Sequence, residues 1–439
     1  MSFFFISAFL VLIFLRPQEW LFEFLWGWPL LDAAFVAAMA GFVLELNERR
    51  VRIPWTSPQL WLIAGVWFAG CWSHIVHTYF GGLIAVLPLM FKTAFFTIVL
   101  LCSLDRPSRL RRLAQMFVVM TGVMAFHCYL EQTRGYGFAE ATPIYVKPPG
   151  QDGYVRTMFF GIFEDPNDTA QIILCSIPMI FAIPRRMGPF KFLICCAVAA
   201  AYVWAVLTTH SRGGQVGMLV MGSLLFASVL PRRLKPWVLW GLLGGYLFMC
   251  PFSASHLDAS AHERIVFWGQ ANWVFTSNPV RTLFGVGANM FADYVEGDRA
   301  AHNAFVLCYT ELGVFGYWFW YGLIQVGIVG AMRSGAALNR PRTVEERWMK
   351  RFSSLAVASL GGYMAAAYFL SRAFIYPTFF LFAIVAAIPV VTQRLLPEDH
   401  PPLLNWRKDL LQWNTVGTLT SILYIYYSIV LLNKAYYGG

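Results

Sequence analysis

His302 is the residue of this chain whose type and position best fit a proton transfer. It lies where a long polar connection meets an apolar run, and Asn303 follows it directly. A neutral imidazole accepts a proton readily near neutral pH, which is what a general base must do. A lone histidine is more often structural, but the position at the edge of an apolar run favours catalysis.

Arg212 lies at a similar edge, in the stretch His210-Ser-Arg-Gly-Gly214 between two apolar runs. A guanidinium there either reaches into the lipid head-group layer or faces an inner cavity. In the second case, the two glycines would let a ligand approach the backbone closely. His210 stands two residues before Arg212 and is the main competitor of His302 as a base.

Arg264 and Trp268 form a third polar group. They are four residues apart, so a helix would place both on one face. The pair is either an interfacial anchor, with tryptophan in the aromatic belt and arginine on phosphate head groups, or part of a binding site. The residues alone leave both interpretations open.

The fourth group runs from Arg156 to Asp168 and contains Asn167. Asn167 or Asp168 could serve only as the N-cap of the following helix. Three carboxylates in this stretch also suggest a cation site, but Pro166 fixes a turn and no second carboxylate cluster completes a metal pair. We therefore expect no bound metal and no other cofactor.

The arginines and the histidine together predict one kind of substrate. Arginine binds phosphate through two parallel hydrogen bonds and stays charged. Arg156, Arg212 and Arg264 therefore fit an amphiphile with a phosphate or pyrophosphate head and a long lipid tail. A base beside that head group indicates transfer of whatever the phosphate carries.

Composition decides where these residues must sit. The 439 residues are 58% hydrophobic and 13% charged, and the mean hydropathy is +0.57. A soluble domain has about 25% charged residues, so a soluble enzyme and a disordered chain are both excluded. The net charge of +10 then reflects loops at a membrane surface rather than a nucleic-acid partner. None of the eight cysteines forms a CxxC pair, which argues against a metal cage or a disulfide framework.

The chain is predicted to be a single all-α polytopic membrane domain over residues 1–439. About 20 apolar residues cross the hydrocarbon core as a helix, and no barrel-like alternation is visible. The candidate spans are 3–15, 29–46, 59–80, 82–102, 113–130, 169–184, 190–209, 214–230, 236–252, 303–332, 352–370, 374–391 and 415–432. They predict 13 transmembrane helices, or 12 if one of the two terminal runs lies flat. The first run lacks a basic n-region and a cleavage site, so we expect a span rather than a signal peptide.

Basic residues alternate between the connections. Most of the 33 lysines and arginines fall in every second connection, so the positive-inside rule places those connections and the N-terminus in the cytoplasm. The long connections 131–168 and 253–302 then face the outside. Within the second, apolar residues recur with helical spacing over 261–275, which predicts an amphipathic helix on or near the membrane surface. All four polar groups lie on the outer side, and 253–302 is expected to carry the active site.

These groups, in this order and spacing, resemble the O-antigen ligase/polymerase superfamily. The resemblance rests on Thr209-His-Ser-Arg-Gly-Gly214, Arg264-x-x-x-Trp268, Leu283-Phe-Gly-Val-Gly287, His302-Asn303-x-Phe305 with Glu311-Leu-Gly313-x-x-Gly316, and Gly161-Ile-Phe-Glu-Asp-Pro-Asn167. It covers about 150–330 closely and the whole chain in the layout of its spans.

The resemblance implies a GT-C-like integral membrane glycosyltransferase of about twelve spans at the periplasmic face of the bacterial inner membrane. Such enzymes take a glycan from undecaprenyl pyrophosphate, and the ligases transfer it to a sugar hydroxyl of lipid A–core, without a metal and with inversion. Carried over to this chain, His302 is the base, while Arg212, Arg264 and Arg156 bind the pyrophosphate. The residues expected to support them are His210, Asn303, Trp268 and Asn167.

Other functions compete with a ligase. An O-antigen polymerase uses the same donor with a second lipid-linked glycan as acceptor, and a protein O-oligosaccharyltransferase uses a Ser or Thr hydroxyl. A glycan flippase or other transporter should show related halves and polar residues near mid-membrane. Only Lys92 lies deep within a predicted span, which argues against transport.

Overall fold

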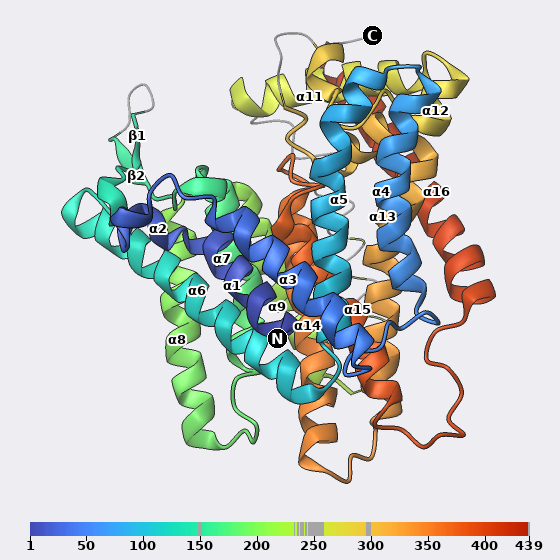
Figure 1. Ribbon diagram of the computed structural model, residues 1–439. Helices are drawn as coiled ribbons and strands as arrows, with labels where there is room; N and C mark the ends of the chain where they lie inside the picture. Colours follow the sequence, from blue (N-terminus) through green and yellow to red (C-terminus); the bar gives the residue numbers. More distant parts are fainter. Residues whose placement is uncertain are drawn as a thin grey trace.

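The computed structural model describes residues 1–147, 152–231, 259–295 and 300–437, with five single positions between 233 and 244. Within that part, the regular structure is almost all α-helix (Figure 1), as expected for an all-α membrane protein. The predicted span 236–252 falls largely outside the described residues, as do parts of the long connections 131–168 and 253–302.

The α-helices follow one another along the chain, joined by both short and long connections. They are α1 (Ser2–Leu15), α2 (Pro17–Trp20), α3 (Leu30–Asn47), α4 (Pro58–Val76), α5 (Phe80–Ser103), α6 (Pro107–Arg134), α7 (Pro166–Ile180), α8 (Pro189–Thr208), α9 (Arg212–Val229), α11 (Ala259–Thr276), α12 (Pro279–Phe284), α13 (Ala304–Ala337), α14 (Val344–Ala367), α15 (Tyr376–Gln393) and α16 (Asn414–Tyr437). A π-helix over Trp406–Trp413 leads into α16. An antiparallel hairpin of β1 (Ile144–Val146) and β2 (Tyr154–Arg156) stands between α6 and α7.

Eight of the described helices are long and apolar enough to cross a membrane, and the chain is therefore a multi-pass membrane protein. They are α3, α4, α5, α6, α8, α13, α15 and the run Trp406–Ala435, which includes most of α16. Helices α1 and α7 are short, with 14 and 15 residues. The total of 12 or 13 spans stays a prediction.

The starts of the helices follow from the local sequence. Proline lies in the first turn of α4, α6, α7, α8 and α15, where the missing N–H is not needed. Side chains cap three helices that matter below: Asp165 caps α7, Ser211 caps α9 and Asn303 caps α13. The cap of α7 is thus Asp165, which accepts the N–H of Asn167 at 2.6 Å. The alternative that Asn167 or Asp168 is that cap is wrong.

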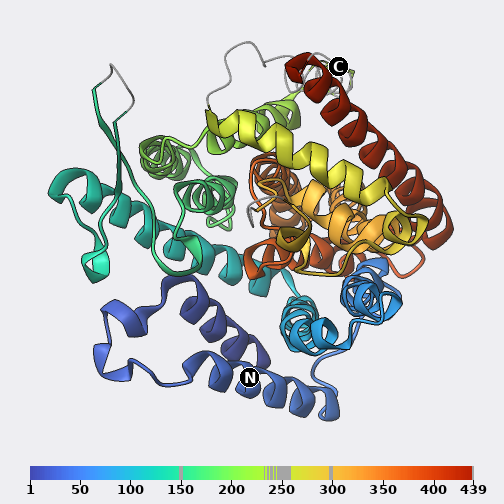
Figure 2. The ribbon, with the colours of Figure 1, turned by 90° about the horizontal axis from the view of Figure 1, so that it is seen from above.

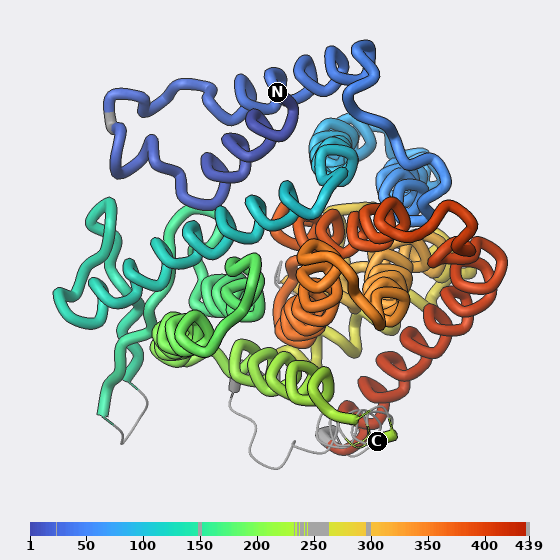
Figure 3. The backbone as a smooth tube through the Cα atoms, turned by 90° about the horizontal axis from the view of Figure 1, so that it is seen from below, coloured from blue at the N-terminus to red at the C-terminus, as the bar shows by residue number. Residues whose placement is uncertain are grey.

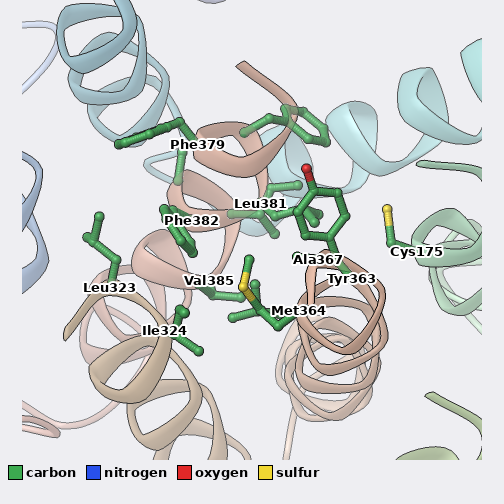
Figure 4. Packing of buried hydrophobic residues seen from close by; sticks show 14 of the residues in the cluster. Cys175, Leu323, Ile324, Tyr363, Met364, Ala367, Phe379, Leu381, Phe382 and Val385 are labelled. Carbon is green, nitrogen blue, oxygen red and sulfur yellow. The ribbon is translucent and has the colours of Figure 1, made fainter. Parts of the chain in front are cut away.

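The long helix α13 stands at the centre of the bundle and packs against α4, α14, α15 and α16 (Figures 2 and 3). Large side chains from α13, α14 and α15 fill the space between these helices (Figure 4). Leu323, Tyr363 and Phe382 are almost completely buried there. Small residues let other pairs approach closely: a Cβ added to Gly217 of α9 would lie 2.8 Å from the carbonyl oxygen of Gly362 in α14.

The Leu283–Gly287 stretch packs against the break in α13. The N–H of Val286 donates to the carbonyl of Thr310 at 3.0 Å, so the loop pairs with α13 where that helix is broken. Gly313 has a φ of 65° at the break, and Gly285 has a φ of 76°. A Cβ at Gly285 would lie 2.1 Å from the carbonyl oxygen of Glu311. Only glycine fits so close a contact at positive φ, which explains the motif without a ligand.

Helix α11 crosses the upper end of the bundle in Figure 1. Its apolar residues Ile265, Trp268 and Phe275 are buried, and α11 packs against α13 and α16. The hydroxyl of Tyr309 donates to Oδ1 of Asn272 at 2.7 Å and ties α13 to α11. The helix therefore turns its apolar face to the protein rather than to lipid.

Candidate functional site

The connections that the sequence predicts to face outside meet at one end of the bundle. In Figure 1 the β1–β2 hairpin, α11 and α12 lie in the upper half, whereas the connections 181–188 and 338–343 lie at the lower end. The sequence predicts the same division between outer and cytoplasmic connections. Hydrogen bonds and one ion pair link the predicted site residues across this upper half.

The first link joins the start of α7 to the α8–α9 junction. Oγ of Ser211 donates to Oδ1 of Asn167 at 2.7 Å and accepts the N–H of Gly214 at 3.0 Å. Arg212 is the exposed first residue of α9. The first turn of a helix leaves backbone N–H groups without intrahelical partners and attracts anions. Arg212 thus adds a full positive charge to an end of a helix that already favours phosphate.

The second link holds the hairpin against the same junction. Nε of Arg156 donates to the carbonyl of Thr209 at 3.1 Å. The N–H of Thr157 donates to the carbonyl of Thr208 at 3.2 Å, and the two threonine hydroxyls lie 3.0 Å apart. Arg156 is half-buried, and at least one of its donors serves this packing. Its predicted role in pyrophosphate binding stays a prediction.

The third link fixes the start of α13 to α11. Nε1 of Trp268 donates to the carbonyl of Ala301 at 2.7 Å, directly before His302. Asn303 is fully buried, and its Oδ1 caps α13 by accepting the N–H groups of Phe305 and Val306. Trp268 is only 6% exposed, so a place in the aromatic belt of the interface is wrong for this residue. Arg264 lies one turn earlier on α11 and is half-buried.

The connection between α14 and α15 closes the network. Oγ of Ser371 accepts the N–H of His302 at 2.6 Å. The next residue, Arg372, forms a two-pronged ion pair with Asp168 of α7, in which Nε lies 3.0 Å from Oδ1 and Nη2 donates to Oδ2. Burial acts to lower the pKa of the Arg372 guanidinium, but the hydrogen bonds and the charge of Asp168 outweigh it and raise that pKa. Ser371 therefore contacts the segment of His302, and its neighbour Arg372 contacts the segment of Asn167.

Sequence reasoning missed Arg372 and Ser371. The sequence pattern singles out neither residue, and it offers Asp168 only as a possible helix cap or as one of three carboxylates of a cation site. One signal was present: a carboxylate in the first turn of an apolar helix needs a cation once it is buried, and Asp168 is 3% exposed. The partner of Asp168 lies 204 residues away, so spacing could not identify it.

The two glycines after Arg212 pack against protein. A Cβ added to Gly213 would lie 3.0 Å from Cβ of Phe369, and one added to Gly214 would lie 2.8 Å from Cβ of Ala170. Both glycines are buried. Their small size lets α9 approach α7 and the end of α14, and this corrects the expectation that they admit a ligand to the backbone.

His210 and His302 share an unusual backbone conformation. Their φ angles are 49° and 47°, in the left-handed region that few residues other than glycine adopt. Each stands directly before the capping residue of a helix, Ser211 or Asn303. Such strain persists only where neighbouring contacts hold it, and it is frequent at functional sites.

Among the described residues, no three His, Cys, Asp or Glu side chains come together in a way that could hold a metal ion. The candidate groups are instead arginines in β2, at the start of α9 and on α11, together with a histidine before α13. Arginines are suited to an anionic head group. A comparison with known protein families and with curated proteins finds no match to this chain.

Proposed function

We propose that the chain is a glycosyltransferase of the O-antigen ligase type. It takes a glycan from undecaprenyl pyrophosphate and transfers it to a sugar hydroxyl of lipid A–core at the periplasmic face of the bacterial inner membrane. One observation carries the proposal: contacts through Ser371 and the Arg372–Asp168 pair connect the segment of His302 to the segment of Arg212 within an apolar helical bundle.

The proposed reaction is a single displacement at the anomeric carbon. His302 takes the proton of the acceptor hydroxyl while the hydroxyl oxygen bonds to that carbon. The bond from the anomeric carbon to the pyrophosphate oxygen breaks, and its electron pair stays on the pyrophosphate. The products are the glycosylated acceptor, undecaprenyl pyrophosphate and a protonated His302, and the configuration is inverted.

The arginines act on the leaving group. An oxocarbenium-like transition state places growing negative charge on the pyrophosphate oxygen, so donors aimed at that oxygen lower the barrier. Arg212 at the start of α9 and Arg264 on α11 come from opposite sides of the contact network and are assigned this role. Trp268 and Asn303 hold the backbone on both sides of His302 in place.

The decisive experiment offers the purified protein two acceptors. The donor is lipid-linked glycan extracted from the membranes of the source organism, and the acceptors are lipid A–core and a second portion of lipid-linked glycan. Product with lipid A–core that is absent with His302→Ala supports the ligase. Glycan chains that lengthen only on the lipid carrier would instead identify a polymerase, and no transfer to either acceptor would contradict the proposal.

The sidedness of the site is part of the proposal. In a background without native cysteines, Glu140→Cys should react with a membrane-impermeant maleimide from the periplasm. Arg340→Cys should react only after the inner membrane is opened. Equal labelling of Arg340→Cys from the periplasm would overturn the orientation and place the site on the wrong side for lipid A–core.

A further inference from the structure

The β1–β2 hairpin is attached to the α8–α9 junction in a defined register. Contacts from Arg156 and Thr157 to Thr208 and Thr209 hold β2 alongside the end of α8. Tyr154 is the first residue of β2, two positions before Arg156. The position of Tyr154 relative to the junction is therefore fixed by the described contacts.

Tyr154 and His210 lie side by side at this junction. Their ring centroids are 4.5 Å apart with the planes tilted by 47°. Both residues are exposed, and Tyr154 retains 36% of its accessible surface. His210 precedes Arg212 by two residues, so the pair of rings lies next to the chain segment of the arginine assigned to the pyrophosphate.

The hairpin register separates two faces. Val146 pairs with Tyr154 and Ile144 pairs with Arg156, so these four residues share the face that meets the junction. Tyr145 pairs with Val155 on the opposite face and packs over Gly153, where a Cβ would lie 1.9 Å from its hydroxyl. The hairpin thus carries one tyrosine toward the junction and one, 64% exposed, away from it.

We infer that the Tyr154–His210 pair is a binding surface for the sugar rings of the donor glycan that are nearest to the pyrophosphate. This inference rests on the proposed function. The face of an aromatic ring carries partial negative charge and packs against the C–H groups of a pyranose, while the hydroxyls of the sugar stay solvated. A glycan whose pyrophosphate contacts Arg212 must place its first sugars within reach of the adjacent rings.

The pair would select for the donor without taking part in the displacement. Tyr154 and His210 would bind the glycan in the ground state and in the transition state alike, which changes KM more than kcat. Tyr154→Ala should therefore raise the KM for lipid-linked glycan roughly tenfold and leave kcat within about twofold. Tyr154→Trp should keep the wild-type KM, since a larger ring preserves the stacking face.

Tyr145→Ala is the matched control, because it removes the same side chain from the other face of the same hairpin. It should leave KM unchanged. Equal KM values for Tyr154→Ala and wild type would overturn the inference, as would equal increases for Tyr154→Ala and Tyr145→Ala.

A binding measurement separates this inference from the proposed function. Glycan released from its lipid pyrophosphate by mild acid is added to the protein in nanodiscs and observed by saturation-transfer difference NMR. Sugar signals that appear with wild type and Tyr145→Ala but not with Tyr154→Ala support the surface, even if no transfer to any acceptor is found. Absence of sugar signals with wild type contradicts the inference, whatever the transfer assay shows.

Discussion

His210 and His302 occupy the same local position in two different helix starts. Each has a left-handed backbone, and each is followed by the residue that caps the next helix, α9 or α13. Their surroundings differ. His210 is exposed and lies against Tyr154, whereas His302 is half-buried and donates its N–H to Ser371. The local sequence at the helix start gives both histidines the same backbone conformation. The tertiary contacts differ, and we expect the contact with Ser371 to hold His302 in position for catalysis.

Substitution of the two histidines tests this comparison most directly. His302→Ala should lower the transfer rate about 10²–10⁴-fold, the usual cost of a lost general base, with donor binding little changed. His210→Ala should raise the KM for the donor and leave kcat nearly unchanged. Single-turnover rates and KM values for both variants check this. If His210→Ala loses the larger share of kcat, the assignments must be exchanged.

Arg212 lies near His210, and Arg264 lies on the helix that contacts the segment of His302. Both arginines are expected to be needed for a normal transfer rate. Arg212→Ala beside His210 and Arg264→Ala beside Trp268 should each lower kcat about 10²-fold or more, by analogy with lost oxyanion donors. The corresponding lysine variants should recover only part of the rate, because an ammonium cannot form the two-pronged contact. The measurement is transfer rate at equal expression. Wild-type turnover in either alanine variant would mean that this arginine only contacts lipid head groups.

Much of the fold could be predicted because its signals are local. The run 303–332 and its polar entry predict a helix beginning near His302, and α13 begins at Ala304 with Asn303 as its cap. The Leu283–Gly287 turn was likewise foreseeable from its glycines. By contrast, the Asp168–Arg372 pair joins residues 204 positions apart, and nothing in local spacing relates them. The use of Gly213 and Gly214 for packing also depends on Phe369 and Ala170, which only the folded chain brings near.

The Asp168–Arg372 pair should connect the two regions energetically. Asp168→Asn leaves the Arg372 guanidinium, whose side chain is 36% exposed, without its carboxylate. Breaking a fully buried pair costs about 3–5 kcal/mol of folding stability, and solvent at Arg372 lowers the expected cost here to about 1–3 kcal/mol. The double variant Asp168→Leu with Arg372→Met should recover most of that loss, because apolar residues of similar size replace buried pairs well. Thermal unfolding in detergent provides the measurement.

The transfer rates of the same variants then show whether the pair also positions the segment of His302 or only stabilises the fold. The double variant should regain stability but keep a transfer rate roughly tenfold below wild type, because the connection no longer fixes the segment of His302 to that of Asn167. Full activity in the stable double variant would show that the pair only supports folding.

The smallest expected effect comes from Ser371, whose hydroxyl accepts the N–H of His302. Ser371→Ala leaves that N–H without its partner, and a net loss of about 1 kcal/mol corresponds to roughly a fivefold lower kcat. KM for the donor should not change, since Ser371 touches the base rather than the proposed pyrophosphate or sugar contacts. Ser371→Thr keeps a hydroxyl at the same place and should restore the rate, whereas a purely structural role would predict lower thermal stability with kcat unaffected. The N–H of His210 donates within its own segment, to the carbonyl of Leu207 at 3.1 Å. Ser371→Ala should therefore leave the additional effect of His210→Ala on KM unchanged. A double variant whose KM departs from that of His210→Ala would show that the two segments are coupled through more than the ion pair.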